Sequence, residues 1–109
     1  MNGNRFLLDT NIIIGLFAND HSIIENIKSH QGIMMIPSIV IGELFFGAEL
    51  SGKKEINIKR IEDLARIIPI LSCDINTARI YGNIKSILKL KGTPLPGNDI
   101  WIAALSVQH

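Results

Sequence analysis

Three of the ten acidic residues, Asp9, Glu43 and Asp99, stand in apolar stretches of the sequence. Asp9 lies in RFLLDTNIIIGLF, Glu43 in IGELFFG and Asp99 in GNDIWIAA, whereas the other acids lie among polar neighbours or at loop-like positions. An ionised carboxylate that is buried without a partner is so costly that it is usually protonated, paired or bound to a metal ion. If the three acids converge, each pair of charges ~5 Å apart repels by roughly 3 kcal/mol at an effective dielectric of about 20, and a proton or a cation must offset that energy.

A hard divalent cation is the partner that this set of acids favours. No lysine or arginine interrupts the apolar runs themselves, so the sequence gives no sign of an internal ion pair. Mg²⁺ or Mn²⁺ suits a few carboxylates completed by water. The alternative that stays open is structural, because an acid can also cap a helix or accept a hydrogen bond from a backbone amide. Other metal ligands are not indicated, since one cysteine forms no thiolate cage and the three histidines share no ligand spacing (Cys73; His21, His30, His109).

The elements that must position Asp9 and Glu43 come from the first half of the chain. RFLLD reads as a strand buried on both faces, and TNIIIGLF after it as a helix capped by Thr10 or Asn11. Ser22 and Glu25 have the spacing of a capping box and predict a second helix. GIMMIP predicts another strand, and SIVIGELFFGAEL a helix that is apolar nearly all round and therefore central.

The second half of the chain predicts two further helices before the last one. From residue 57 to residue 68, apolar residues recur at the spacing of a helix. IIPIL is predicted to be a short strand at a sheet edge, because Pro69 cannot donate a hydrogen bond to a neighbouring strand. Asn76 is placed to cap a helix that ends at Gly92. The loop TPLPG then leads to a helix that starts at Asn98, which puts Asp99 in its first turn, where the helix dipole favours an anion. Trp101 and Tyr81 are expected to pack rather than to stack on a nucleic-acid base.

This alternation predicts an α/β fold with a parallel sheet and helices on both faces. With 109 residues and 47% hydrophobic composition, the chain is expected to form one domain over 1–109. Asp9 would end the first strand at its carboxyl edge, where open α/β sheets hold their ligands. No apolar run reaches the ~20 residues of a membrane helix, and the N-terminus lacks the features of a signal peptide, so we expect a cytoplasmic protein without membrane contact.

Charge is unevenly distributed along the chain. Residues 1–52 hold two bases against five acids, whereas residues 53–91 hold nine bases against four acids. A basic middle beside acidic ends suits a polyanion bound across an acidic site. The ordinary alternative is a set of solvated helix faces, because charged side chains mostly mark exposed surface.

The motifs that carry the three acids resemble a known family. LLDTNIII near the N-terminus, SIVIGELFFGA in the middle and PLPGNDIWIAA near the end are similar to the successive motifs of the PIN-domain ribonucleases, and more narrowly of the VapC toxins of toxin–antitoxin pairs. The resemblance runs from Phe6 to the last residue. It implies a divalent-metal-dependent endoribonuclease that is toxic by cleaving RNA, forms a homodimer and is inhibited by a cognate antitoxin. The matching positions are three metal-binding acids and three supporting polar residues (Asp9, Glu43, Asp99; Thr10, Asn11, Asn98).

On this resemblance, the metal would activate a water molecule and stabilise the leaving oxygen of the phosphodiester. Thr10 and Asn11 would hold the carboxylates, unless they serve only as helix caps. Some of the bases between Lys53 and Lys91 would contact phosphates. The implied fold is a three-layer α/β/α arrangement with a short central parallel sheet in which a further strand follows the last helix. Because the sequence stops at His109, we expect the domain to lack its C-terminal strand and RFLLD to have one unpaired edge.

Two other functions compete with this interpretation. An aspartyl-phosphate phosphatase would use Asp9 as nucleophile, but the DxDxT pattern of the haloacid-dehalogenase type is broken, since Asn11 and Ile13 replace the second acid and the threonine. The second alternative is a non-catalytic, shortened PIN fold that binds an antitoxin-like partner or RNA without cutting it.

Overall fold

The computed structural model describes residues 5–29 and 32–109, so His30 lies outside the described residues. No helix within those ranges is both long and apolar enough to span a bilayer. The elements confirm the predicted α/β alternation. In chain order they are β1 (Arg5–Leu7), α1 (Thr10–Phe17), α2 (His21–Ser29), β2 (Ile33–Pro37), α3 (Ser38–Leu50), α4 (Lys54–Ile67), β3 (Ile70–Leu71), α5 (Ile75–Lys91) and α6 (Gly97–Gln108).

The three strands form one parallel sheet in the order β1-β2-β3. The backbone amide of Leu8 donates to the carbonyl of Met35 over 2.9 Å, which extends the β1–β2 pairing by one residue. On the other side of β2, the amide of Ile36 donates to the carbonyl of Pro69 over 2.9 Å. Pro69 therefore contributes only an acceptor, and the predicted position of β3 at a sheet edge is confirmed.

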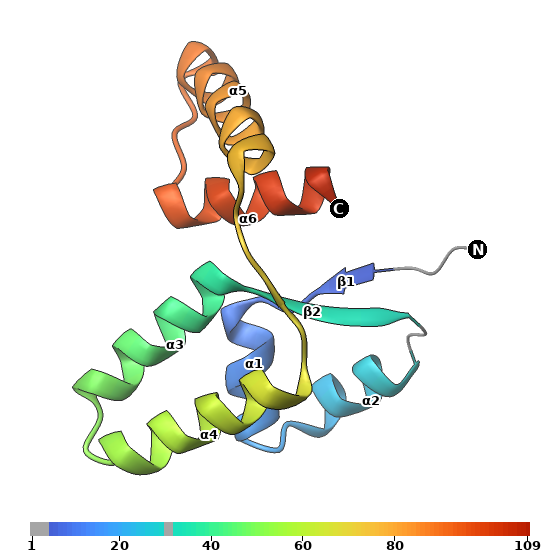
Figure 1. Ribbon diagram of the computed structural model, residues 1–109, viewed down its shortest axis with the longest axis vertical. Helices are drawn as coiled ribbons and strands as arrows, with labels where there is room; N and C mark the ends of the chain where they lie inside the picture. The colour runs from blue at the N-terminus through green and yellow to red at the C-terminus, as the bar shows by residue number, and fades with distance from the viewer. Residues whose placement is uncertain (1–4, 30–31) are drawn as a thin grey trace.

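Helices α1, α2 and α4 lie on one side of the sheet, and α5 and α6 lie on the other (Figure 1). Aliphatic side chains from the end of β1, from β2 and from α1, α3 and α4 form one buried cluster. Its members are Leu8, Ile13, Ile36, Val40, Leu44, Ala48 and Ile61. Three of them follow one another at four-residue spacing along α3, so this helix is central, as its nearly unbroken apolar sequence predicts. We call β1–β3 with α1–α4 the α/β body.

Helices α5 and α6 pack against each other and form a hairpin with its own buried residues. Ile100, Ala104 and Leu105 of α6 are buried, as is Thr77 of α5. The Tyr81 ring stacks on the indole of Trp101, with centroids 4.1 Å apart and planes 20° apart, so both aromatic residues pack as expected. Gly92 ends α5 in the left-handed conformation (φ 70°), as the sequence predicts.

The helix caps differ from the prediction, because an acid one or two residues earlier takes the position. Asp9 rather than Thr10 or Asn11 caps α1, since its carboxylate accepts from the amide of Ile12. Asp20 rather than Ser22 caps α2 and accepts from the backbone amides at residues 22 and 23. An aspartate caps a helix as well as serine or asparagine does, so residue type alone does not decide between neighbouring candidates.

The same correction applies to the hairpin. Asp74 rather than Asn76 caps α5 and forms a reciprocal capping box with Thr77. Helix α6 begins at Gly97, one residue before the expected Asn98, and its cap residue Pro96 makes no side-chain hydrogen bond. These shifts leave Asn98 and Asp99 in the first turn of α6, as predicted.

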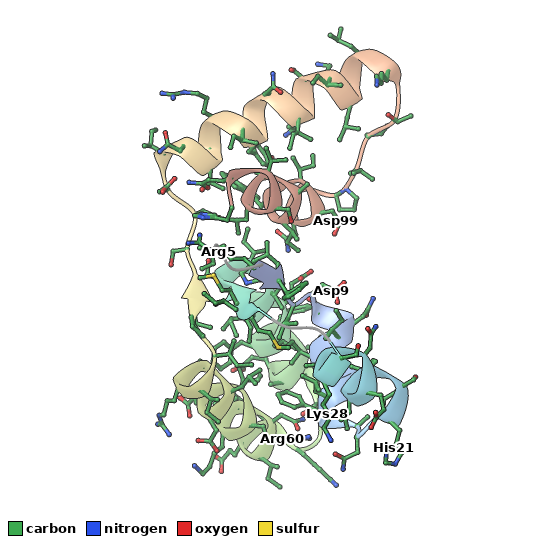
Figure 2. All side chains as sticks on the ribbon, turned by 90° about the vertical axis from the view of Figure 1, so that its right-hand side faces the viewer. Arg5, Asp9, His21, Lys28, Arg60 and Asp99 are labelled. Carbon is green, nitrogen blue, oxygen red and sulfur yellow. The ribbon has the colours of Figure 1, made fainter. Side chains whose placement is uncertain are left out.

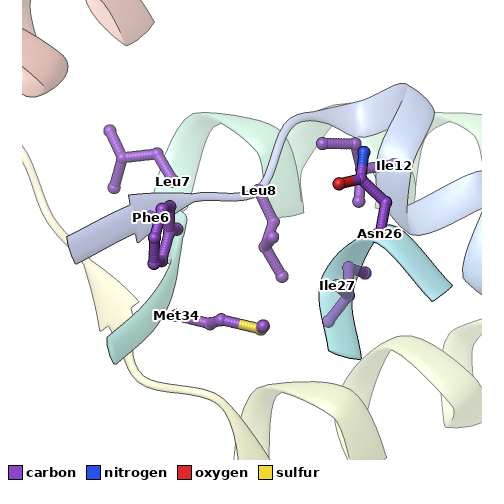
Figure 3. Close-up of a pocket in the computed structure, with 7 residues that line it drawn as sticks. All are labelled: Phe6, Leu7, Leu8, Ile12, Asn26, Ile27 and Met34. Carbon is purple, nitrogen blue, oxygen red and sulfur yellow. The ribbon is translucent and has the colours of Figure 1, made fainter. Parts of the chain in front are cut away.

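Strand β1 pairs on one side only within the described part of the chain, as expected for RFLLD. Beside it lies an apolar hollow of about 200 Å³ between β1, α1, α2 and β2 (Figure 3). Its lining residues are Phe6, Leu7, Leu8, Ile12, Asn26, Ile27 and Met34. The edge of the sheet nearest Asp9 therefore borders a largely apolar surface.

Candidate active site

Asp9 lies between β1 and α1, at the carboxyl end of the strand. Its backbone is extended (φ −87°, ψ 175°), and its Oδ1 accepts a hydrogen bond from the amide of Ile12 over 2.9 Å. The partial positive charge of the helix N-terminus favours a carboxylate here. Oδ2 has no hydrogen-bond partner among the described residues. Asp9 is exposed, which corrects the expectation that its apolar neighbours in the sequence bury it.

Glu43 lies in the middle of α3 and is half-buried. The hydroxyl of Thr10 donates to its Oε1 over 2.6 Å. This contact joins α1 to α3 across 33 positions of sequence and places Glu43 next to the residue that follows Asp9. Thr10 thus contacts a carboxylate, and the cap of α1 is left to Asp9. Asn11 is exposed in the first turn of α1.

Asn98 and Asp99 lie in the first turn of α6, and both are exposed. Asn98 and Glu43 line the same open hollow, together with Ile39, Gly42 and Phe46 of α3. The side chain of Asp99 makes no hydrogen bond with any of the described residues. Figure 2 shows Asp99 on the hairpin and Asp9 at the start of α1, toward the same side of the molecule. The predicted residues therefore come from three places: the end of β1, the middle of α3 and the start of α6.

Comparison with known proteins accounts for this arrangement of elements. The sequence profile described as "PIN domain" matches residues 6–109. The chain belongs to the PIN-domain family. Within the family it is similar to VapC proteins, which confirms the resemblance carried by the three motifs.

Three relatives illustrate that similarity. Ribonuclease VapC2 of Haemophilus influenzae is 38% identical over 101 residues, which are 92% of this chain and 76% of the relative. The tRNA(fMet)-specific endonuclease VapC of Shigella flexneri is 37% identical over 100 residues, 91% of this chain and 76% of the relative. The crystal structure of DNA-bound VapBC from Salmonella typhimurium aligns with a TM-score of 0.82 at 34% identity, and covers 92% of this chain and 76% of that one.

The PIN domain offers only oxygen atoms at these positions, which is the donor type that Mg²⁺ and Mn²⁺ prefer. Within residues 5–29 and 32–109, however, no three histidine, cysteine, aspartate or glutamate side chains come together closely enough to hold a metal ion. That the carboxylates of Asp9, Glu43 and Asp99 face one another in a single cleft stays a prediction. Asp9 and Asp99 are exposed, so water can solvate both charges while no cation is bound.

Proposed function

We propose that this PIN domain is a divalent-metal-dependent endoribonuclease toxin that hydrolyses RNA phosphodiester bonds. The observation that carries the proposal is the hydrogen bond from Thr10 to Glu43 beside Asp9, at the carboxyl end of β1. In this bond Thr10, one of the proposed supporting residues, contacts Glu43, one of the proposed acids. Asp9, the second proposed acid, directly precedes Thr10 in the sequence. The relatives named ribonuclease and endonuclease support the same activity.

In this proposal Asp9, Glu43 and Asp99 hold Mg²⁺ or Mn²⁺. When bound, the cation supplies a nucleophile by lowering the pKa of water and stabilises the charge on the leaving oxygen. The chain's own part is orientation. The α1 amide of Ile12 fixes one oxygen of Asp9 and leaves the other available.

The supporting residues act on these acids. The Thr10 hydroxyl fixes Oε1 of Glu43 in the same way, so the second oxygen of that carboxylate stays available. Asn11 and Asn98 are exposed beside the acids and supply amide groups that can bind substrate or water.

An antitoxin and a second copy of the chain are the proposed protein partners. Solved structures similar to this chain include VapBC from Salmonella typhimurium, VapBC-1 from Haemophilus influenzae and a toxin–antitoxin complex from Klebsiella pneumoniae. In this chain a cavity of about 310 Å³ lies between α1, α3 and α4, and both Thr10 and Glu43 line it. A partner segment in that cavity could place a basic side chain beside the acids and block them. Ile14, Phe46 and Leu50 are exposed on α1 and α3, and such apolar surface is typical of interfaces.

A non-catalytic binding module is the second candidate, and one observation favours it. The three acids do not form a ligand cluster within the described residues, so the same surface could bind RNA or a partner without cutting RNA. The phosphatase alternative has less support, because Thr10 bonds Glu43 and no second aspartate of a DxDxT pattern stands beside Asp9.

The test is RNA cleavage by the purified chain with Mg²⁺ or Mn²⁺, with and without EDTA. Bulk bacterial tRNA and ribosomal RNA serve as substrates, since one relative is named as tRNA-specific. We expect cleavage that EDTA abolishes and that Asp9→Asn abolishes, whereas Asp63→Asn on the surface of α4 cleaves as the wild type does. RNA binding without cleavage would favour the binding module. Hydrolysis of p-nitrophenyl phosphate without RNA cleavage would favour the phosphatase.

A further inference from the structure

Eight of the nine bases of residues 53–91 lie on α4 or α5, and they form two groups that the sequence alone does not distinguish. Those of α4 are largely compensated. Lys54 pairs with Glu49 over 2.8 Å, and Asp63 accepts from both Lys59 and Arg66. The guanidinium of Arg60 donates to the carbonyl of Phe17 over 2.6 Å, at the C-terminal end of α1, and lies 4.4 Å from the centroid of the same residue's ring. Helix α4 therefore offers little free positive charge to a polyanion.

Helix α5 is the opposite case. It carries Arg79, Lys85, Lys89 and Lys91, and no acid occurs from residue 75 to residue 98. Lys89 and Lys91 lie in the last turn, where they also stabilise the helix dipole. Lys85 lies before that turn, and its ammonium is 5.5 Å from the centre of the Tyr81 ring and 3.4 Å from the Tyr81 hydroxyl. The dipole therefore does not account for Lys85.

Tyr81, Lys85 and Lys89 follow one another at four-residue spacing, which places them on one face of α5. That face is directed at the start of α6. Tyr81 stacks on Trp101, and its hydroxyl is 3.9 Å from the position that a Cβ on Gly97 would occupy. Gly97 directly precedes Asn98 and Asp99 in the chain. The basic face of α5 thus runs beside the part of the candidate active site that lies on the hairpin.

A cavity of about 290 Å³ lies along this face, between α5, the loop before α6 and α6 itself. Two lysines and four apolar residues line it: Lys85, Lys89, Leu88, Pro94, Leu95 and Ile100. We call this cavity the lysine groove. Ile100 is buried, whereas Leu95 is half exposed at the entrance. The groove therefore combines an apolar interior with two ammonium groups that have no acidic partner among the described residues.

We propose that the lysine groove binds an unpaired nucleotide of the RNA substrate, with its 5′ and 3′ phosphates on Lys85 and Lys89 and its base against Leu88 and Leu95. The inference rests on the proposed ribonuclease function. Acidic side chains repel a phosphodiester, so a polyanion that reaches Asp99 needs cations close by, and Lys85 and Lys89 on this face have no acidic partner among the described residues. Recognition of a base in a pocket requires that it be unpaired, so the groove selects single-stranded positions.

The first experiment measures binding of a fluorescein-labelled, unstructured 12-nucleotide RNA by anisotropy in EDTA, so that nothing is cleaved. The double variant Lys85→Gln/Lys89→Gln should bind the RNA about tenfold more weakly. The logarithm of the association constant should also fall less steeply with the logarithm of the salt concentration, by about 1.4 in slope, or about 0.7 for each lost phosphate contact. The matched control Arg79→Gln/Lys91→Gln removes the same charge from other faces of α5 and should change affinity by less than about threefold. If the double variant fails to fold, each single lysine variant should show half of the slope change.

The second experiment tests whether the lysine groove binds the base of the nucleotide. A 12-mer of abasic ribose phosphate should bind the wild type several-fold more weakly than the RNA of the same length. Leu95→Ser should weaken binding of the normal RNA and leave binding of the abasic oligomer unchanged. Equal affinity of the two oligomers for the wild type would overturn the assignment of the base to the groove.

Three further results would overturn the proposal. The first is an equal loss of affinity in the lysine pair and in the matched control. The second is competition by polyglutamate of equal charge as effective as competition by RNA, which would indicate an acidic protein partner. The third is a change of oligomeric state in Lys85→Gln/Lys89→Gln, which would indicate a contact between copies of the chain.

The two proposals fail separately. Wild-type RNA cleavage by the lysine variant, with unchanged binding, would overturn the groove and leave the nuclease intact. Binding through the lysine pair without metal-dependent cleavage by the wild type would overturn the nuclease function and leave the groove as a binding site.

Discussion

The α/β body and the α5–α6 hairpin each hold part of the candidate active site, but they position it by different means. In the body, Asp9 and Glu43 are fixed by hydrogen bonds next to a large aliphatic cluster. In the hairpin, Asn98 and Asp99 lie in an exposed first turn whose cap makes no side-chain hydrogen bond. The orientation of the body's acids therefore follows from local contacts, whereas that of Asp99 depends on how α6 as a whole is held.

The hairpin is held by polar contacts as well as by apolar packing. Thr77 is fully buried, and its hydroxyl accepts from the amide of Asp74 and contacts Gln108 near the C-terminal end of α6. Gln108 in turn donates to Asp74 over 3.0 Å. These contacts join the start of α5 to the end of α6. Because the candidate site is divided between two differently stabilised units, changes in the body and changes in the hairpin should affect it differently.

The largest expected effect is on catalysis. Asp9→Asn in the body and Asp99→Asn in the hairpin should each lower RNA cleavage by roughly a thousandfold or more, as expected for groups that act at the reacting centre. Both variants should keep their melting temperature, because Asn also caps a helix and Asp99 makes no hydrogen bond with the described residues. Cleavage rates and thermal unfolding of the two variants check this. A melting temperature that falls together with activity would show a structural role instead.

The second expected effect separates the two cores. Ile36 is fully buried in the body, and Ile36→Ala should cost about 2–5 kcal/mol of unfolding free energy. Trp101 is the one tryptophan and lies in the hairpin, so its fluorescence reports that unit while far-ultraviolet circular dichroism reports all helices. In urea, the circular dichroism transition of Ile36→Ala should shift more than the fluorescence transition. Coincident shifts would show that body and hairpin unfold as one cooperative unit.

Sequence patterns predicted the helices and strands well, because the spacing of apolar residues can be read directly from the sequence. TNIIIGLF is helix α1 over its whole length, and the Pro69 argument placed β3 correctly at an edge. Burial of the acids was predicted less well. Apolar neighbours in sequence do not bury a residue that ends a strand or starts a helix, and Asp9 and Asp99 are exposed for that reason. Ion pairing within α4 depends on side-chain positions in space, so the sequence could not separate compensated from free bases.

The third expected effect concerns the polar contacts of the hairpin. Thr77→Val keeps the volume of the buried side chain but removes its hydroxyl, so it should cost about 1–3 kcal/mol of unfolding free energy. Thr77→Ser keeps the hydroxyl and serves as the matched control, with a smaller loss. Urea unfolding followed by Trp101 fluorescence measures both. An unchanged midpoint for Thr77→Val would show that apolar packing alone holds α5 against α6.

The smallest expected effect is on acid stability, with one group in each unit. Hydrogen bonds from the backbone of Ile23 lower the pKa of Asp20, and those from the backbone of Thr77 lower the pKa of Asp74, both from an ordinary value of 3.8. A lowered pKa stabilises the fold fully above the unfolded value, and this contribution disappears as pH falls through the folded value. Asp74→Asn should therefore weaken the pH dependence below about 4 that Trp101 fluorescence reports, whereas Asp20→Asn should not. Equal effects of both variants on this probe would contradict the separation of the units.

We propose that body and hairpin contribute to one metal site, and Mn²⁺ binding measured by isothermal titration calorimetry tests this claim most directly. We expect Asp9→Asn, Glu43→Gln and Asp99→Asn each to weaken Mn²⁺ binding, whereas Asp63→Asn should bind Mn²⁺ as the wild type does. Wild-type Mn²⁺ affinity in Asp99→Asn, with loss in Asp9→Asn, would contradict the claim and confine the metal site to the body.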